Sequence, residues 1–358
     1  MKILIPDSIN GEYSSRIKGV SKEVTIDILT VKRNRSIMRR TINFMAKRLF
    51  PYYFYKKIKS YTMKNRISFY INGVPFDGGS NGIEVLLVPH ELDAQVLEQL
   101  FPRLPNLKWI HSLMTGMDHI VSVCPSPRNL RLTNSGNVHS KRIAEFVLSI
   151  ILATSKRIPE HLFLQRKRKW QSLASRELYR STVGIIGLGN IGSELAKRAK
   201  ALGMKVVAMD IESKINKDID LLVNPQQINI LLSQSDFVVL CCPLTKETKG
   251  MIGEKQLKCM KKNAYLINVA RGALIQDHAL LRALKERRIQ GACLDVLVEQ
   301  PLPSHSPFYK MDNVIITHHS AFYSKEAVSE KFCVFLENLV HYIKGEQLIN
   351  EIDKDRGF

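Results

Sequence analysis

The sequence predicts an α/β protein made of two doubly wound domains, each built on a parallel sheet. At 358 residues the chain exceeds the size at which a single core usually stops growing, about 250 to 300 residues. Its composition, 45% hydrophobic and 24% charged, is that of an ordinary globular protein with enough apolar residues for two cores. From Thr182 onward, short β-rich apolar runs alternate with helix-length connections, a pattern typical of crossover units and a parallel sheet.

The predicted strands fall into two sets, one in each half of the chain. The second half contains the runs TVGII, KVVAMD, DFVVL, AYLIN, GACLDVL and NVIIT. The first 135 residues repeat the pattern on a smaller scale, with KILIP, VTIDIL, EVLLVP, LKWIHSL and LRLTN. We therefore expect a second, smaller α/β domain at the start of the chain, and its amino-terminal run is too short for a signal peptide.

Two apolar helices are predicted outside these strands. Residues 141–158 are apolar nearly all round with basic ends, so we expect this helix to be buried on most faces and to cross a domain boundary or a subunit interface. The helix that ends at Gly345 carries one apolar stripe, and we expect it to return to the first domain. The stripe consists of Val328, Phe332, Phe335, Leu336, Leu339 and Ile343.

The cysteine content and the charge distribution bear on the cellular compartment and on the binding partners. The six cysteines show no CxxC pair or metal-ligand spacing, which favours reduced packing residues, a cytoplasmic protein and no metal site. No apolar run reaches the roughly 20 residues that span a bilayer. The net charge of +20 is concentrated in a basic insertion at about 32–80, where residues 32–66 hold twelve basic and no acidic side chains. A lid or oligomer contact, an anionic membrane surface, a nucleic acid and an acidic partner protein are the roles that this insertion leaves open.

The segment TVGIIGLGNIG indicates a dinucleotide site. Gly187, Gly189 and Gly192 have the G-x-G-x-x-G spacing directly after a strand and at the start of a helix, where free amides can bind a pyrophosphate. The residues between the last two glycines, Asn190 and Ile191, belong to the same predicted site. The next strand ends in Asp210, whose carboxylate can bind ribose hydroxyls and would repel the extra phosphate of NADP, so NAD is favoured. The alternative is a glycine-rich turn that only packs helix on strand.

Polar side chains gather at the ends of three predicted strands, where open parallel sheets bind their ligands. Arg271 follows AYLIN, and a guanidinium there is suited to a bidentate grip on a carboxylate. His318 and His319 end the last strand. The strand before it is followed by Asp295, Glu299 and Gln300.

In order and separation, these motifs resemble the D-isomer-specific 2-hydroxyacid dehydrogenase family. The resemblance is carried by VGIIGLGNIG, VVLCCPLTKETKGMIG, LINVARGALI, LDVLVEQPLP and NVIITHHSAFYS, and by LKWIHSLMTGMDHI and TNSGNVHSKRIAEFVL, so it covers about residues 83–340. It implies a Rossmann NAD-binding domain at 138–321, inserted into a flavodoxin-like substrate domain formed by 1–137 and 322–358. It also implies a homodimer.

The resemblance further implies the role of single residues in interconverting a 2-keto acid and a D-2-hydroxy acid. Arg271 would bind the carboxylate and polarise the carbonyl, and His319 would be the acid/base; His318 stands where the family usually has proline. Backbone amides of Thr115 and Gly116 would hold the substrate carboxylate. The implied cofactor contacts are Asp295 to the nicotinamide amide, Pro243 lining the nicotinamide, and Ala270.

One position departs from the family pattern. The family ordinarily has a glutamate before the proline that pairs with the histidine, and here the residue is Gln300, as in the related formate dehydrogenases. We expect Gln300 to orient His319 without charging it. The alternatives are that Glu299 takes the place, or that Gln300 only packs. Three functions thus stay open: a keto-acid reductase, a formate-type oxidase, and a non-catalytic NAD-sensing interaction protein.

Overall fold

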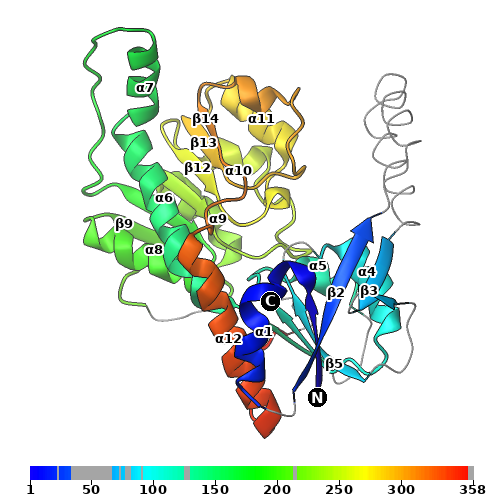
Figure 1. Ribbon diagram of the computed structural model, residues 1–358. Coiled ribbons are helices and arrows are strands. Elements are labelled where there is room, and N and C mark those ends of the chain that lie inside the picture. Colours follow the sequence, from blue (N-terminus) through cyan, green and yellow to red (C-terminus); the bar gives the residue numbers. More distant parts are fainter. Residues whose placement is uncertain are drawn as a thin grey trace. The chain divides into compact units, whose positions relative to one another are not determined.

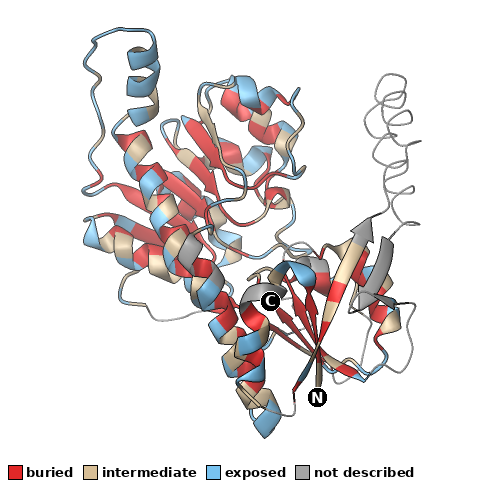
Figure 2. Cartoon of the chain, viewed as in Figure 1, coloured by how far each residue is buried: buried red, intermediate tan, exposed pale blue. Residues whose placement is uncertain are grey.

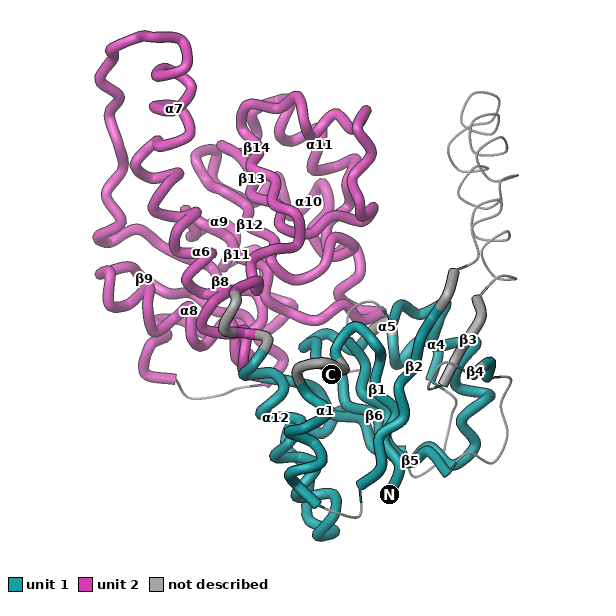
Figure 3. The backbone as a smooth tube through the Cα atoms, in the orientation of Figure 1, with its two compact units in different colours: residues 1–136, 328–358 teal, residues 137–327 magenta. Residues whose placement is uncertain are grey.

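The chain forms two compact units, each built around one sheet. The structure, a computed structural model, describes residues 1–21, 24–33, 67–71, 74–76, 82–89, 92–124, 130–212 and 216–353. Unit 1 consists of Met1–Gly136 and Val328–Phe358, and unit 2 of Asn137–Ala327 (Figure 3). Unit 2 is thus inserted into the sequence of unit 1. The sequence-based boundaries were 137/138 and 321/322.

The sheet of unit 2 has seven parallel strands in the order β10-β9-β8-β11-β12-β13-β14. Their bounds are β8 Thr182–Ile186, β9 Lys205–Met209, β10 Leu221–Val223, β11 Phe237–Leu240, β12 Tyr265–Asn268, β13 Gly291–Leu294 and β14 Val314–Ile316. The order reverses between β8 and β11, which is the switch point where doubly wound sheets bind dinucleotides. The six predicted strands are present; β10 is additional, and its three residues are too few to show a pattern.

Helices cover both faces of this sheet (Figures 1 and 2). The covering helices are α6 Ser140–Ser155, α8 Asn190–Ala201, α9 Ile228–Gln234, α10 Glu254–Cys259 and α11 Asp277–Lys285. The helix α7 Ile158–Arg166 follows α6 and does not cover the sheet. Alternate residues of one strand serve two cores, because successive side chains point to opposite faces. In β11, Phe237 and Val239 join the core with α6 and α8, while Val238 and Leu240 join the core with α10 and α11.

The prediction that the helix of 141–158 is buried on most faces is wrong for this unit. Eight of the 16 residues of α6 are buried, on the side that packs against α8, and Leu152 is 40% exposed. After a left-handed turn at Arg157 the chain continues as α7, in which no residue is buried. Figure 1 shows α7 and the extended chain after it projecting from the rest of unit 2. We call residues 158–179 the arm.

Unit 1 has a seven-stranded sheet in the order β4-β3-β2-β1-β5-β6-β7. Its strands are β1 Lys2–Pro6, β2 Thr25–Arg33, β3 Ile67–Ile71, β4 Val74–Pro75, β5 Ile83–Val88, β6 Trp109–Ser112 and β7 Arg131–Asn134. The five predicted strands are parallel and follow the flavodoxin-like order 2-1-3-4-5. The predicted parallel sheet is thus present, and β3 and β4 add an antiparallel edge next to β2.

The basic insertion contributes the end of β2 and the strands β3 and β4. Residues 34–66, which hold most of its basic side chains, lie outside the described residues. The proposed contacts of this segment with an anionic surface or an acidic partner therefore stay predictions.

Within the described residues, the helices of unit 1 are α1 Asn10–Lys18, α4 Ala94–Leu100, α5 Asp118–Val121 and most of α12 Lys325–Lys344. On α12, Phe332, Phe335 and Leu339 are fully buried in one core with Trp109 of β6. The last residue of the predicted stripe, Ile343, is instead 44% exposed. Within the described ranges, no helix combines the length and apolarity needed to cross a membrane.

Candidate active site

The glycine loop between β8 and α8 is tightly packed except at its middle glycine. Gly187 has φ +98°, and a Cβ there would lie 2.6 Å from the amide nitrogen of Cys242. A Cβ on Gly192 would lie 2.1 Å from the carbonyl oxygen of Gly187. At Gly189, which precedes the first residue of α8, a Cβ would meet nothing within 4 Å. The loop therefore leaves open space in front of the free amides of a helix amino terminus, which fits a pyrophosphate.

Asp210 lies beside this loop at the end of β9. Its Oδ2 accepts a hydrogen bond of 2.6 Å from the Leu188 amide, and its Oδ1 accepts one of 3.0 Å from the Glu212 amide. The carboxylate is thus fixed next to the loop. Of the other predicted cofactor residues, Asn190 is exposed and Ile191 half-buried. Pro243 is exposed and follows the Cys242 backbone that Gly187 touches.

Arg271 is held at the end of β12 by a buried amide that sequence reasoning missed. Asn268 is fully buried; its Nδ2 donates to the Arg271 carbonyl at 2.9 Å and its Oδ1 accepts from the Ala270 amide at 3.1 Å. The next residue, Gly272, lies so close to the segment after β13 that a Cβ would be 2.1 Å from the Leu297 carbonyl carbon. The Asn in LINVAR was the available signal, since it ends a buried strand.

His319 pairs with Gln300. The Nδ1 of His319 lies 3.1 Å from the Oε1 of Gln300, whose Nε2 donates to the Leu297 carbonyl at 3.0 Å. With its nitrogen engaged there, the amide presents an oxygen to the imidazole, so Nδ1 of His319 carries the hydrogen of this contact. Gln300, rather than Glu299, makes this contact.

A buried carboxylate builds the turn that carries His319. Asp295 is 2% exposed. Its Oδ1 accepts hydrogen bonds from the Thr317 hydroxyl at 2.6 Å and from the Ser320 amide at 2.9 Å. The Ala321 amide also donates to the carboxylate. The His319 amide donates to the Asp295 carbonyl at 2.8 Å, and His319 has φ +54°. Asp295 thus positions His319, and its proposed contact with the nicotinamide amide stays a prediction.

An aromatic ring that sequence reasoning missed borders the imidazole. Phe322 makes an edge contact with His319 at 5.7 Å between centroids, and another with the buried His139 at 5.1 Å. His318 is exposed. In the described part of the chain, no cluster of His, Cys, Asp and Glu side chains could hold a metal ion.

Thr115 and Gly116 belong to unit 1, in the loop that follows β6. The Thr115 carbonyl accepts a hydrogen bond of 2.7 Å from Asn134 Nδ2, and the Thr115 hydroxyl donates to the Gly136 carbonyl at 3.2 Å. The predicted substrate-binding and catalytic residues thus form two sets, one in each unit: Thr115 and Gly116 belong to unit 1, and the rest to unit 2. Arg271, Gln300 and His319 lie at the carboxyl ends of three adjacent strands of unit 2.

The sheet order and the glycine loop define unit 2 as a dinucleotide-binding domain of the Rossmann type. Residues 148–321 match the family described as "D-isomer specific 2-hydroxyacid dehydrogenase, NAD binding domain". The chain belongs to the D-isomer specific 2-hydroxyacid dehydrogenase family. It is therefore an NAD(P)-dependent oxidoreductase of 2-keto and 2-hydroxy acids.

Individual relatives cover most of the chain. A glyoxylate reductase of Thermofilum pendens is 37% identical over 269 residues, which are 73% of this chain and 78% of that protein. The NADPH-dependent glyoxylate/hydroxypyruvate reductase of Sinorhizobium meliloti, solved with NADP and sulfate, has a TM-score of 0.71 and 26% identity over 77% of this chain and 87% of that one. A family member from Xanthobacter autotrophicus, solved with NADPH and MES, has a TM-score of 0.76 and 25% identity over 100% and 99% of the two chains.

Proposed function

We propose that this protein reduces a small 2-keto acid to the D-2-hydroxy acid with NADH. The observation that carries the proposal is the contact between His319 and Gln300, at strand ends adjacent to β12, the strand that Arg271 follows. A proton donor and a carboxylate-binding cation are what the reaction needs. Glyoxylate is the first substrate to test, since several relatives are glyoxylate reductases.

Each residue would have one task in this reaction. Arg271 binds the substrate carboxylate and stabilises the negative charge that develops on the keto oxygen. The amides of Thr115 and Gly116 bind the same carboxylate. The nicotinamide, when bound, supplies the hydride that the keto carbon receives. Protonated His319 gives its Nε2 proton to the keto oxygen, so that the carbonyl becomes a hydroxyl and the imidazole becomes neutral.

The reaction is tested by following loss of NADH with a panel of 2-keto acids. Turnover of at least one acid is expected, together with its loss in His319→Gln at unchanged affinity for NADH. Absence of turnover across the panel by a protein that binds NADH would overturn the proposal. A non-catalytic NAD-sensing protein would likewise bind NADH without turning over any of the acids.

We infer a preference for NAD over NADP from the fixed carboxylate of Asp210, because it would repel a 2′-phosphate. The two solved relatives described above hold NADP or NADPH, so the coenzyme has to be measured for this chain. We expect kcat/KM for NADH to exceed that for NADPH by roughly tenfold or more, about 1.4 kcal/mol. Asp210→Ser should reduce this ratio, while Glu212→Gln, its neighbouring control, should keep it.

The neutral partner of His319 also favours a second candidate, oxidation of formate with NAD. That reaction moves a hydride and needs no proton from the histidine, so the Gln300 contact suits it. Formate with NAD in the same assay separates the two. NADH formation from formate without keto-acid turnover would favour this second function.

We infer that the arm is part of a homodimer interface. Several of its large apolar side chains are exposed, with Phe163 at 60%, Leu162 at 50% and Trp170 fully exposed. A partner would also cover the exposed side of α6, including Leu152. Phe163→Glu should give monomers in light scattering, whereas Gln165→Glu, with the same charge change on the same helix, should stay dimeric. The six free cysteines support our proposal of a cytoplasmic location.

A further inference from the structure

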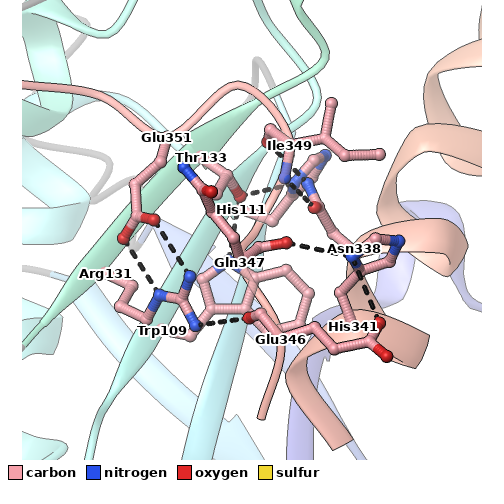
Figure 4. A network of polar contacts seen from close by, with 10 residues as sticks. All are labelled: Trp109, His111, Arg131, Thr133, Asn338, His341, Glu346, Gln347, Ile349 and Glu351. Atoms are coloured by element: carbon pink, nitrogen blue, oxygen red, sulfur yellow. Dashed lines mark hydrogen bonds and ion pairs between the residues drawn. The ribbon is translucent and has the colours of Figure 1, made fainter. Parts of the chain in front are cut away.

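The last described segment of the chain pairs with the edge of the unit 1 sheet. We call residues 346–352 the clasp; their carboxyl end meets β7, where Glu351 forms an antiparallel bridge with Thr133. The Ile352 amide donates to the Leu132 carbonyl at 2.8 Å, and the Asn134 amide donates to the Asn350 carbonyl at 3.4 Å. Figure 4 shows the polar contacts that surround this segment.

Side chains of α12 and β7 fix the clasp. The fully buried Asn338 of α12 donates to the Ile349 carbonyl at 3.0 Å and accepts from the Ile349 amide at 2.6 Å (Figure 4). Arg131 of β7 makes two hydrogen bonds of 2.9 Å to the two carboxylate oxygens of Glu351. Such a bidentate pair fixes direction as well as distance.

The clasp brings Asn350 against the end of β7. Asn350 has φ +54°, which turns its side chain toward Gly136, where a Cβ would lie 2.1 Å from the Asn350 Nδ2. The same Nδ2 donates to the Asn134 carbonyl at 3.4 Å. Gly136 itself has φ +46° and is the last residue of unit 1 before the chain enters unit 2. A larger residue at position 136 would displace Asn350.

The side chain of Asn134 joins two loops. It is 6% exposed, its Nδ2 donates to the Thr115 carbonyl at 2.7 Å, and its Oδ1 accepts from the Gly136 amide at 2.8 Å. The Thr115 hydroxyl closes the ring by donating to the Gly136 carbonyl. The amide of Asn134 both donates to the loop that holds Thr115 and accepts from the loop that holds Gly136. A carboxylate of the same length could accept but not donate.

We propose that Asn134 is a positioning residue for the substrate carboxylate, and that the clasp holds Asn134 and Gly136 in place through Asn350. The hydrogen bond from Asn134 fixes the Thr115 carbonyl, and with it the peptide plane whose amide belongs to Gly116. This inference rests on the proposed function, in which the Thr115 and Gly116 amides bind the carboxylate.

The test separates KM from kcat in two variants. Asn134→Asp keeps the shape and the acceptor but removes the donor, so KM for the keto acid should rise roughly 3- to 10-fold, the size of one net hydrogen bond. Asn350→Gly keeps the left-handed backbone and removes the amide, so a smaller rise in KM is expected. In both variants kcat and KM for NADH should change less than twofold, by about 0.4 kcal/mol or less.

Asn313→Asp is the matched control. Asn313 Nδ2 also donates to a carbonyl, that of Leu284, but it precedes β14 and so lies at the amino-terminal end of the other sheet. An unchanged KM in Asn134→Asp, or an equal rise in Asn313→Asp, would overturn the positioning role while leaving the reductase proposal standing. A wild-type protein that binds NADH but turns over no 2-keto acid would overturn both.

Discussion

The buried histidine of β6 should make unit 1 sensitive to acid. His111 is fully buried, its Nδ1 lies 2.8 Å from the Thr133 hydroxyl, and its ring contacts the Phe335 ring of α12 at 5.3 Å. Among the described residues, its Nε2 has no hydrogen-bond partner. Burial lowers the pKa of His111 from 6.5 to about 3, because an imidazolium would be separated from water.

The direction of the effect follows from proton binding. Between pH 6.5 and about 3 the unfolded chain binds a proton at position 111 and the folded chain does not, so the free energy of unfolding falls as the pH falls through this window. Each pH unit within it costs about 1.36 kcal/mol. At pH 6.5 the unfolded imidazole is half protonated, so from about pH 6.5 to about pH 4.5 the loss from this one group is roughly 2.3 kcal/mol.

Urea unfolding at two pH values measures this loss. The chain has two tryptophans, so a Trp170→Phe background leaves the buried Trp109, near His111, as the only tryptophan that reports on unit 1. In that background, His111→Asn keeps a polar contact toward Thr133 but cannot take up the proton. The histidine protein should lose roughly 2.3 kcal/mol more than the asparagine variant between about pH 6.5 and about pH 4.5. If the free energy of unfolding fell equally with pH in the histidine protein and the asparagine variant, the proposal that His111 is buried as a neutral imidazole would be refuted.

Three substitutions in unit 2 have expected outcomes of their own. Gln300→Glu should shift the pH at which keto-acid reduction declines by about 1 unit or more to the alkaline side, because a paired carboxylate raises the pKa of His319. Glu299→Gln, the adjacent control, should leave the pH profile unchanged. A shift in Glu299→Gln with none in Gln300→Glu would assign the pairing to Glu299. Arg271→Lys should lower kcat/KM for the keto acid roughly 10- to 100-fold at unchanged KM for NADH, since a lysine cannot make the bidentate contact; equal kinetics would exclude the carboxylate role. Gly272→Ala should lower the free energy of unfolding by about 1 to 3 kcal/mol, because its Cβ would meet backbone at 2.1 Å, and an unchanged urea midpoint would contradict this packing.

The regular parts of the fold were accessible from the sequence because most of the predicted strands are short, apolar and buried. All eleven predicted strands form, and the family assignment is confirmed by the comparisons. What escaped prediction lacked such a pattern. The strand β10 has one buried residue in three, and β3 and β4 emerge from a segment dominated by its charge.

The site was accessible only as a set of residues at strand ends. Their spacing placed Arg271, Gln300 and His319 at neighbouring ends of one sheet, and the Gln300 contact with His319 followed from a single departure from a known pattern. The supporting contacts of Asn268 and Asn134 depend on side-chain direction and on residues far apart in sequence. Nothing in the local sequence indicates that Asn350 meets Gly136.

The insertion of unit 2 sets an order for folding during synthesis. Unit 2 is continuous in sequence, so its sheet can be completed as soon as the ribosome has made its last strand. The nascent amino-terminal part of unit 1 has to wait, because Phe332 and Phe335, which cover Trp109, are translated nearly last. Until then the face of β6 that bears Trp109 lacks these covering side chains, and a truncated chain would present a finished dinucleotide domain attached to an open sheet.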